Sequence, residues 1–260
     1  YSRRELRIGE SFPVEEGVFS FGSGAQAEAV ARAYDEFVER SLRDATSDLQ
    51  ANEPVIDYTN RIVDIMGTGA VSISSAMDAF FNAAEQLSTD PPSAPLRTDF
   101  LNTAEVLAGR FKDISSQVDN IGVESQLALR QSVEELNALS EQLLKVNKQL
   151  NRKSKVIEQP PGMLDERDTI LRKMSELVKL GVTELPNGQV QVNFGGVGRG
   201  YEIVTANDAK PVEIVSNDKS GGSDLRLLLD PYGVNRPLPG DPEGTIGGSL
   251  AFRTDVLRPV

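Results

Sequence analysis

Apolar residues recur every three or four positions over most of residues 25–180, and this spacing predicts helices rather than strands. From about Ala25 a stripe of this kind continues to Met66. Pro54 lies inside it, and we expect this proline to kink the helix or to start a second one. After a glycine-rich break, a shorter helix is expected over residues 74–87.

The most regular pattern runs from Phe100 to Ile121, where apolar residues alternate steps of four and three. This heptad seam predicts packing against a partner helix, with Ile114 buried near its centre. After Gly122 the stripe resumes one residue out of phase. Residues 98–154 therefore form either one helix, roughly 85 Å long at 1.5 Å per residue, or two antiparallel helices with a break near Gly122. The pattern leaves both possibilities open.

Met163 to Leu180 reads as another helix, with Gly181 as its C-terminal cap. The apolar period then changes from 3.6 to 2, and Asn187-Gly188 predicts a tight turn between two strands. The strand candidates are residues 182–185, 190–194, 201–204, 212–215 and 225–229.

The N-terminal residues 1–24 are expected to be extended, because polar and apolar residues alternate and glycines punctuate them. The fold class is therefore α+β: a long antiparallel α-helical rod domain with a small inserted antiparallel β domain. We divide the chain into residues 1–181 (rod and extended segment), 182–245 (β domain and a Pro/Gly-rich connection) and 246–260 (the helical return). The β segment is expected to fold around a core of its own.

Composition narrows the possible functions. The chain has 260 residues, a formal net charge of −12, no cysteine and no histidine. An acidic chain does not favour nucleic-acid binding. The missing residue types exclude disulfides, thiol nucleophiles, histidine ligands and a Ser-His-Asp triad. No apolar run has the ~18 residues of a membrane span. Because the first residue is Tyr1 rather than methionine, we expect a fragment of a longer chain.

Three segments could carry chemistry, and each is more simply structural. The loop Gly195 to Gly200 lacks the lysine and the following helix of a phosphate site, so we expect a hairpin connection. Asp165 to Asp168 could suggest a metal site, but its arginine neighbours favour a solvated, salt-bridged helix start. A basic run is read as a solvated face or a docking patch for an acidic partner; it comprises Lys145, Lys148, Arg152, Lys153 and Lys155. We expect no catalytic residue, no cofactor and no metal ligand.

Several stretches resemble the flagellar hook-associated proteins of FlgK type, and they occur in the family's order along nearly the whole chain. Tyr1-Ser2-Arg3-Arg4 is similar to the end of the N-terminal segment shared by flagellar axial proteins. Arg32 to Val38 is similar to the family's Arg-x-Tyr-Asp-x-Phe-Leu segment, with valine in place of the last leucine. Leu164 to Asp168 is similar to Leu-Leu-Asp-Gln-Arg-Asp, and Gly188 to Asn193 to the strand after it. Gly247 to Arg253 is a looser match to a Gly-Gly-x-Leu region.

The resemblance implies a structural role and no enzymatic activity: a junction protein that joins hook to filament in the extracellular part of the bacterial flagellum. It implies export without a cleaved signal peptide. The partners that it implies are hook protein, a second hook-associated junction protein, copies of the same chain in a ring and an export chaperone that binds a missing C-terminal part. Neither nucleic acid nor membrane is among them.

The alternative is the ligand-sensing helical bundle of a bacterial chemoreceptor. That interpretation requires flanking membrane helices, and a β insert of about 50 residues would be unusual in it. A Ser-Lys hydrolase is a third possibility that no motif favours.

Overall fold

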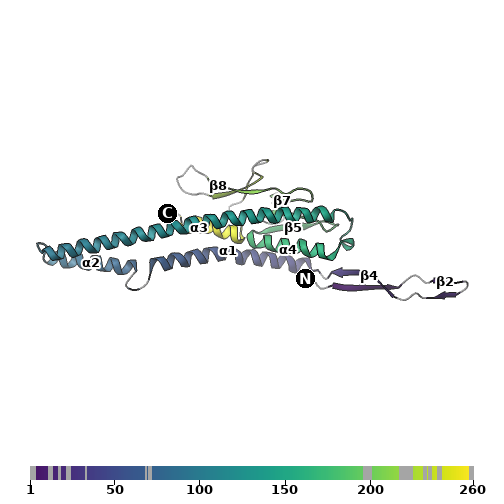
Figure 1. Ribbon diagram of the computed structural model, residues 1–260, viewed down its shortest axis with the longest axis horizontal. Helices are drawn as coiled ribbons and strands as arrows, with labels where there is room; N and C mark the ends of the chain where they lie inside the picture. Colours follow the sequence, from purple (N-terminus) through teal and green to yellow (C-terminus); the bar gives the residue numbers. More distant parts are fainter. Residues whose placement is uncertain are drawn as a thin grey trace.

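The computed structural model describes residues 4–10, 14–16, 19–21, 25–32, 34–67, 69, 72–195, 201–216, 225–230, 233, 236–238 and 242–257. Figure 1 shows a helical rod with strands packed along part of it and a two-stranded arm that projects from one end. The predicted α+β class is confirmed. The helices are α1 (Glu36–Met66), α2 (Ile73–Thr89), α3 (Ala94–Leu150), α4 (Pro161–Leu177) and α5 (Gly244–Ala251), with a 3-10 turn at Val156–Glu158 and a π turn at Phe252–Val256.

Helix α3 is one continuous helix, which decides between the two possibilities left open by the pattern around Gly122. It begins at Ala94, so Pro95 lies in its first turn. Proline is tolerated there because the first backbone N–H groups of a helix have no partner within it. In Figure 1, α3 runs beside α1 and α2 for most of its length.

The two halves of α3 differ in burial. From Ile121 to Leu150 the helix contributes twelve buried residues, because α1, α4, α5 and the strands surround it there. Between Phe100 and Val118 the seam residues are only half-buried, and Phe111 is 51% exposed. The prediction that Ile114 is buried is therefore wrong. The main neighbour of this half is the short helix α2, and one helix cannot enclose a seam.

Helix α1 differs from our expectations in where it begins and in its path at Pro54. Its first residue is Glu36, not Ala25; residues Ala25–Arg32 form strand β4, which pairs antiparallel with β1 (Arg4–Glu10). The alternation Ala-Gln-Ala-Glu-Ala-Val-Ala-Arg has the period of a strand, and pairing with β1 overrides the helix propensity of alanine. The helix also continues through Pro54, which is buried.

The first residues are extended where they are described, as predicted. Strands β2 (Val14–Glu16) and β3 (Phe19–Phe21) pair with each other beyond the β1–β4 pair. Together these two ribbons form the arm, which we define as residues 4–32. Arg4 and Arg32 are directly opposite each other in the register, at the end of the arm nearest the rod.

The strand candidates after α4 are confirmed with small shifts. They form two antiparallel three-stranded sheets, β5–β6–β7 and β8–β9–β10. The strands are β5 (Leu180–Glu184), β6 (Val190–Phe194), β7 (Glu202–Val204), β8 (Val212–Ser216), β9 (Leu225–Leu229) and β10 (Arg236–Pro237). The turn at Asn187-Gly188 forms as expected, with Gly188 at φ +85°. Gly181 is not a helix cap, because α4 ends at Leu177 and Gly181 pairs with Asn193 inside the sheet.

The core continues from the helices into the sheets. Leu143, Leu150 and Met174 belong to the same buried cluster as Phe194 and Ile203. The predicted boundary at residue 182 remains a prediction. Because helix and strand residues share one core, however, we no longer expect the β segment to fold independently of the rod.

Two asparagines on α3 attach the strands to the helix. The amide of Asn147 donates to the carbonyl of Val190 and accepts from the backbone N–H of Val190, at 2.8 and 3.0 Å. Asn137 makes the same two-way contact with Val212, at 2.8 Å in both directions. These bonds satisfy backbone groups at strand positions and thereby fix each sheet against α3.

Candidate functional site

The two family-like segments around Arg32 and Asp168, 136 residues apart in the chain, meet in the fold. Arg32 ends β4, Tyr34 precedes α1, and Asp165 and Asp168 lie in the first turns of α4. Asp35 caps α1 by accepting from the backbone N–H of Phe37 at 3.0 Å. We call the side chains gathered here the arm-base cluster: Arg4, Arg32, Tyr34, Asp165, Arg167, Asp168 and Glu184.

Arg167 and Asp168 form the centre of the cluster and are each 1% exposed. Arg167 Nη2 lies 2.8 Å from Asp168 Oδ1, and its Nη1 donates to Glu184 Oε1 at 2.8 Å and to the Gly188 carbonyl at 2.6 Å. The guanidinium thus joins α4 to β5 and to the β5–β6 turn. The expectation of a solvated helix start is wrong here, because the hairpin and the base of the arm cover this part of α4.

Arg32 connects the arm to the same helix. Its Nη2 donates to Asp168 Oδ2, and its Nε lies 3.0 Å from Asp165 Oδ1. Arg4, on the paired strand, reaches Asp165 Oδ2 at 3.5 Å. The Arg32 guanidinium also lies over the ring of Tyr34, 4.7 Å from its centroid. Both strands of the arm are therefore held by carboxylates of α4.

The charges of the cluster form a network of ion pairs that shifts the pKa values of two of its members. Burial disfavours the charged form of Arg167, but Asp168 and Glu184 more than compensate and raise the pKa of the guanidinium. Burial, together with the same two carboxylates, raises the pKa of the Tyr34 hydroxyl. Both effects keep Arg167 charged and Tyr34 neutral at physiological pH.

A further ion pair ties α4 to α1 beside the cluster. Arg172 donates to both carboxylate oxygens of Glu39, at 3.1 and 2.8 Å. This hydrogen bonding lowers the pKa of the Glu39 carboxyl and raises that of Arg172. The start of α1 is thus fixed against α4 on both sides of Asp35.

Comparison with known proteins identifies the fold. The family model of the flagellar hook-associated protein FlgK helical domain matches residues 59–260. This chain belongs to that family. The chain is 22% identical over 240 residues to flagellar hook-associated protein 1 of Escherichia coli (strain K12), and 23% identical over 234 residues to that of Bacillus subtilis (strain 168).

The match to the E. coli protein covers 91% of this chain and 43% of the relative, so the chain spans less than half the length of that protein. The solved structure of the flagellar hook junction protein FlgK from Burkholderia pseudomallei superposes with a TM-score of 0.68 at 21% identity. It covers 85% of this chain and 39% of that one. The FlgK-type resemblance is confirmed, and the chemoreceptor alternative is not supported.

The FlgK-like motifs acquire structural roles in this fold. Gly248 lets α5 approach α1 closely, since a Cβ there would lie 2.1 Å from the Ala51 carbonyl oxygen. Phe252 stacks on Tyr58 with ring centroids 4.8 Å apart. Arg253 donates to the Gly122 carbonyl at 2.7 Å. The Gly247–Arg253 segment therefore joins α1, α3 and α5.

The other candidate segments lie apart from the arm-base cluster. The Gly195–Gly200 loop follows β6, and its residues 196–200 lie outside the described residues. The pairing of β6 with β7 agrees with a hairpin connection. The side chains of the basic run, Lys145 to Lys155, are exposed at the end of α3. Within the described part of the chain, no three acidic side chains are grouped so as to hold a metal ion, and no helix is long and apolar enough to cross a membrane.

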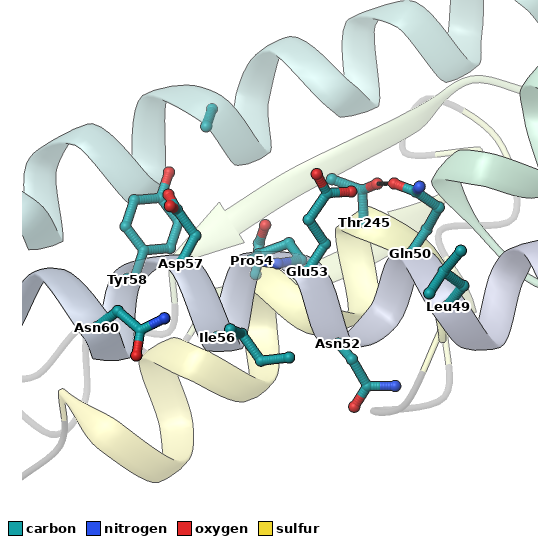
Figure 2. A pocket seen from close by; sticks show the side chains of 12 residues that line it. Leu49, Gln50, Asn52, Glu53, Pro54, Ile56, Asp57, Tyr58, Asn60 and Thr245 are labelled. Carbon is teal, nitrogen blue, oxygen red and sulfur yellow. Dashed lines mark hydrogen bonds between the residues drawn. The ribbon is translucent and has the colours of Figure 1, made fainter.

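A groove of about 760 Å³ lies along the middle of α1. Figure 2 shows Tyr58 and Glu53 on the side of α1 near the other helices, with Thr245 bonded to Gln50 across to α5 at 3.4 Å. Ile56 and Asn52 extend from the lower part of the helix in this view. The carboxylates of Glu53 and Asp57 are among the groups that line the groove, and an exposed apolar surface of α1 lies beside them.

That surface is a stripe on α1 that our sequence analysis missed. Leu42, Leu49, Ile56 and Val63 are seven residues apart and between 48% and 67% exposed. The residues that α1 buries, Arg43, Ser47 and Pro54, lie on the opposite side of the helix at 100° per residue. We call these four apolar residues the α1 stripe. The signal was present in the sequence as this heptad spacing, within a region where we had noted one apolar stripe.

Proposed function

We propose that the protein containing this chain is a non-catalytic structural subunit of the bacterial flagellum, positioned at the junction of hook and filament outside the cell. Membership of the FlgK helical-domain family is the observation that carries this proposal. The relatives are named flagellar hook-associated protein 1, and a similar structure is named a hook junction protein.

The arrangement of the chain suits such a role. A continuous 57-residue helix with α1 and α2 alongside it gives a stiff rod, and polar groups at the arm base are used in ion pairs rather than left for chemistry. We further propose the partners expected for a junction: hook protein, a second junction protein, copies of the same chain in a ring and an export chaperone.

The α1 stripe is the surface that we propose is covered in the assembled junction. Four large apolar residues at heptad spacing are the pattern of a helix that packs against another helix. Glu53 lies on the same face as Leu49 and Ile56, which favours a covering helix with basic residues.

Disruption of the gene in its own bacterium tests the function. Cells without the protein should assemble hooks that carry no filaments, and the native gene should restore filaments and swimming. Normal filaments in the disrupted strain would contradict the proposal.

A complementation series tests the stripe separately. A gene carrying Leu49→Asp and Ile56→Asp should fail to restore filaments, although the purified variant chain melts like the parent because both side chains are already exposed. Glu135→Gln, at an exposed position of α3 outside the stripe, is the control and should restore filaments. Full restoration by the double variant would show that the stripe is not a contact surface.

A further inference from the structure

The base of the arm, where Arg4 and Arg32 lie, contacts the helical rod. Beyond the pairing of its own strands, its principal contact is between β4 and α4, and Figure 1 shows the ribbon projecting past the end of the helices. A two-stranded ribbon attached at one end acts as a lever, so the few contacts at its base determine its direction.

Those contacts are ionic and come from both strands. Arg4 and Arg32 face each other in the β1–β4 register, and both reach the first turns of α4. Arg32 bridges Asp165 and Asp168, while the ion pair that Arg4 makes within the described residues is with Asp165. The two arginines differ in exposure: the side chain of Arg32 is 8% exposed and that of Arg4 is 48% exposed.

The residues on the rod side of this contact are fixed independently of the arm. Asp168 is held by Arg167, which is anchored in turn by Glu184 and the Gly188 carbonyl. Asp35 caps α1 through its own backbone contacts. Loss of the arginine contacts would therefore free the arm while α4 and α1 keep their positions.

We propose that Arg4 and Arg32 form an electrostatic clamp that sets the angle between the arm and the rod, and that opening this clamp lets the arm change direction without unfolding the rod. Arg32 is the principal positioning residue, because its guanidinium donates to Asp168 and lies within ion-pair distance of Asp165 as well. Arg4 contributes an outer contact that salt screens more readily than the buried one. This inference goes beyond the proposed function and concerns the chain alone.

Distance measurement between spin labels tests the clamp. The chain has no cysteine, so Ile8→Cys on β1, where the side chain is 66% exposed, and Lys173→Cys on the exposed side of α4 give two unique labelling sites. Electron–electron double resonance should show one narrow distance population in the parent chain at both low and high salt.

Arg32→Ala should at least double the width of that distribution, while helical circular dichroism still shows a folded rod. Arg32→Lys keeps the charge but cannot bridge both carboxylates as the planar fork does, so it should give an intermediate width. Arg4→Ala should broaden the distribution slightly, and the exposed Arg130→Ala should leave it unchanged.

Two results would overturn the proposal: a broad distribution in the parent chain, or a distribution in Arg32→Ala as narrow as that of the parent. If Arg32→Ala does not fold, Asp165→Asn carries the test, because that side chain is 20% exposed and contacts both arginines. An unchanged narrow distribution in Asp165→Asn would then reject the clamp.

Discussion

Arg167 illustrates how a charged residue can organise a fold from the inside. Its guanidinium is buried, yet its N–H groups have acceptors on α4, on β5 and in the β5–β6 turn. These contacts offset the cost of removing the charge from water. The sequence indicated correctly that Asp165 to Asp168 would be salt-bridged. It could not show that the helix start is buried, because that burial comes from the β5–β6 turn and from Arg32, both distant in the chain.

Arg167→Met should lower the free energy of unfolding by about 3 kcal/mol or more, because it leaves the carboxylates of Asp168 and Glu184 short of a partner in a buried site. Arg130→Met, at an exposed position of α3, should change it by less than about 0.5 kcal/mol. Urea unfolding followed by circular dichroism measures both. Equal midpoints for the two variants would show that the Arg167 network does not stabilise the fold.

Glu39 should make stability depend on pH. Its folded pKa is lowered by the hydrogen bonds from Arg172, so the native state binds fewer protons than the unfolded chain at acidic pH. The stabilisation is present above the ordinary glutamate value of 4.5 and is lost as pH falls through the lower folded value. Glu39→Gln should therefore lose less stability between about pH 5 and pH 3 than the parent, as measured by thermal unfolding across that range. An acid loss in Glu39→Gln as large as the parent's would reject the linkage.

At the scale of elements, local patterns predicted most of the fold. The switch to period 2 near residue 181 and the Asn187-Gly188 turn gave β5 and β6 closely, because both signals are local. Strand β4 was missed because alanine favours helices. Its strand conformation depends on pairing with β1, about 20 residues earlier in the chain. The path of α1 through Pro54 was missed for a similar reason: tertiary contact with α5 keeps the helix continuous at a residue that disfavours it.

The close approach of α5 to α1 gives a direct prediction. Gly248→Ala should destabilise the fold by about 2 kcal/mol or more, because the new methyl group would lie 2.1 Å from the Ala51 carbonyl oxygen and would push the helices apart. Gly109→Ala is the matched control: a Cβ there meets nothing within 4 Å, so the substitution should stabilise α3 by roughly 0.5–1 kcal/mol. Thermal melts of the two variants should shift in opposite directions. A Gly248→Ala melt at or above the parent temperature would contradict the packing.

At the scale of the whole molecule, we predicted the division into rod and β domain from the change of apolar period near residue 181. Such a pattern cannot show that the helices and the strands share one hydrophobic core. Phe194 and Ile203 are fully buried in the same cluster as Leu143 and Leu171. The strands are therefore part of what keeps this end of α3 and α4 folded, whereas the α2 end of the rod lies away from that core.

Replacing residues 182–243 by a Gly/Ser linker should consequently remove cooperative unfolding of the adjacent helices. We expect a clear loss of helical circular dichroism at 25 °C and a broad melt, because the apolar faces of α3 and α4 would be left exposed. A variant with the parent's helical signal and a sharp melt would restore the view that the β segment is a separate domain.

The position of the protein in an intact flagellum tests the proposed structural role most directly. Flagella isolated from the source bacterium can be labelled with gold-conjugated antibodies raised against the 260-residue chain and imaged by electron microscopy. Label confined to a short band where hook meets filament is the predicted result. Label along the whole filament, or intact hook–filament structures that carry no label, would contradict a junction subunit.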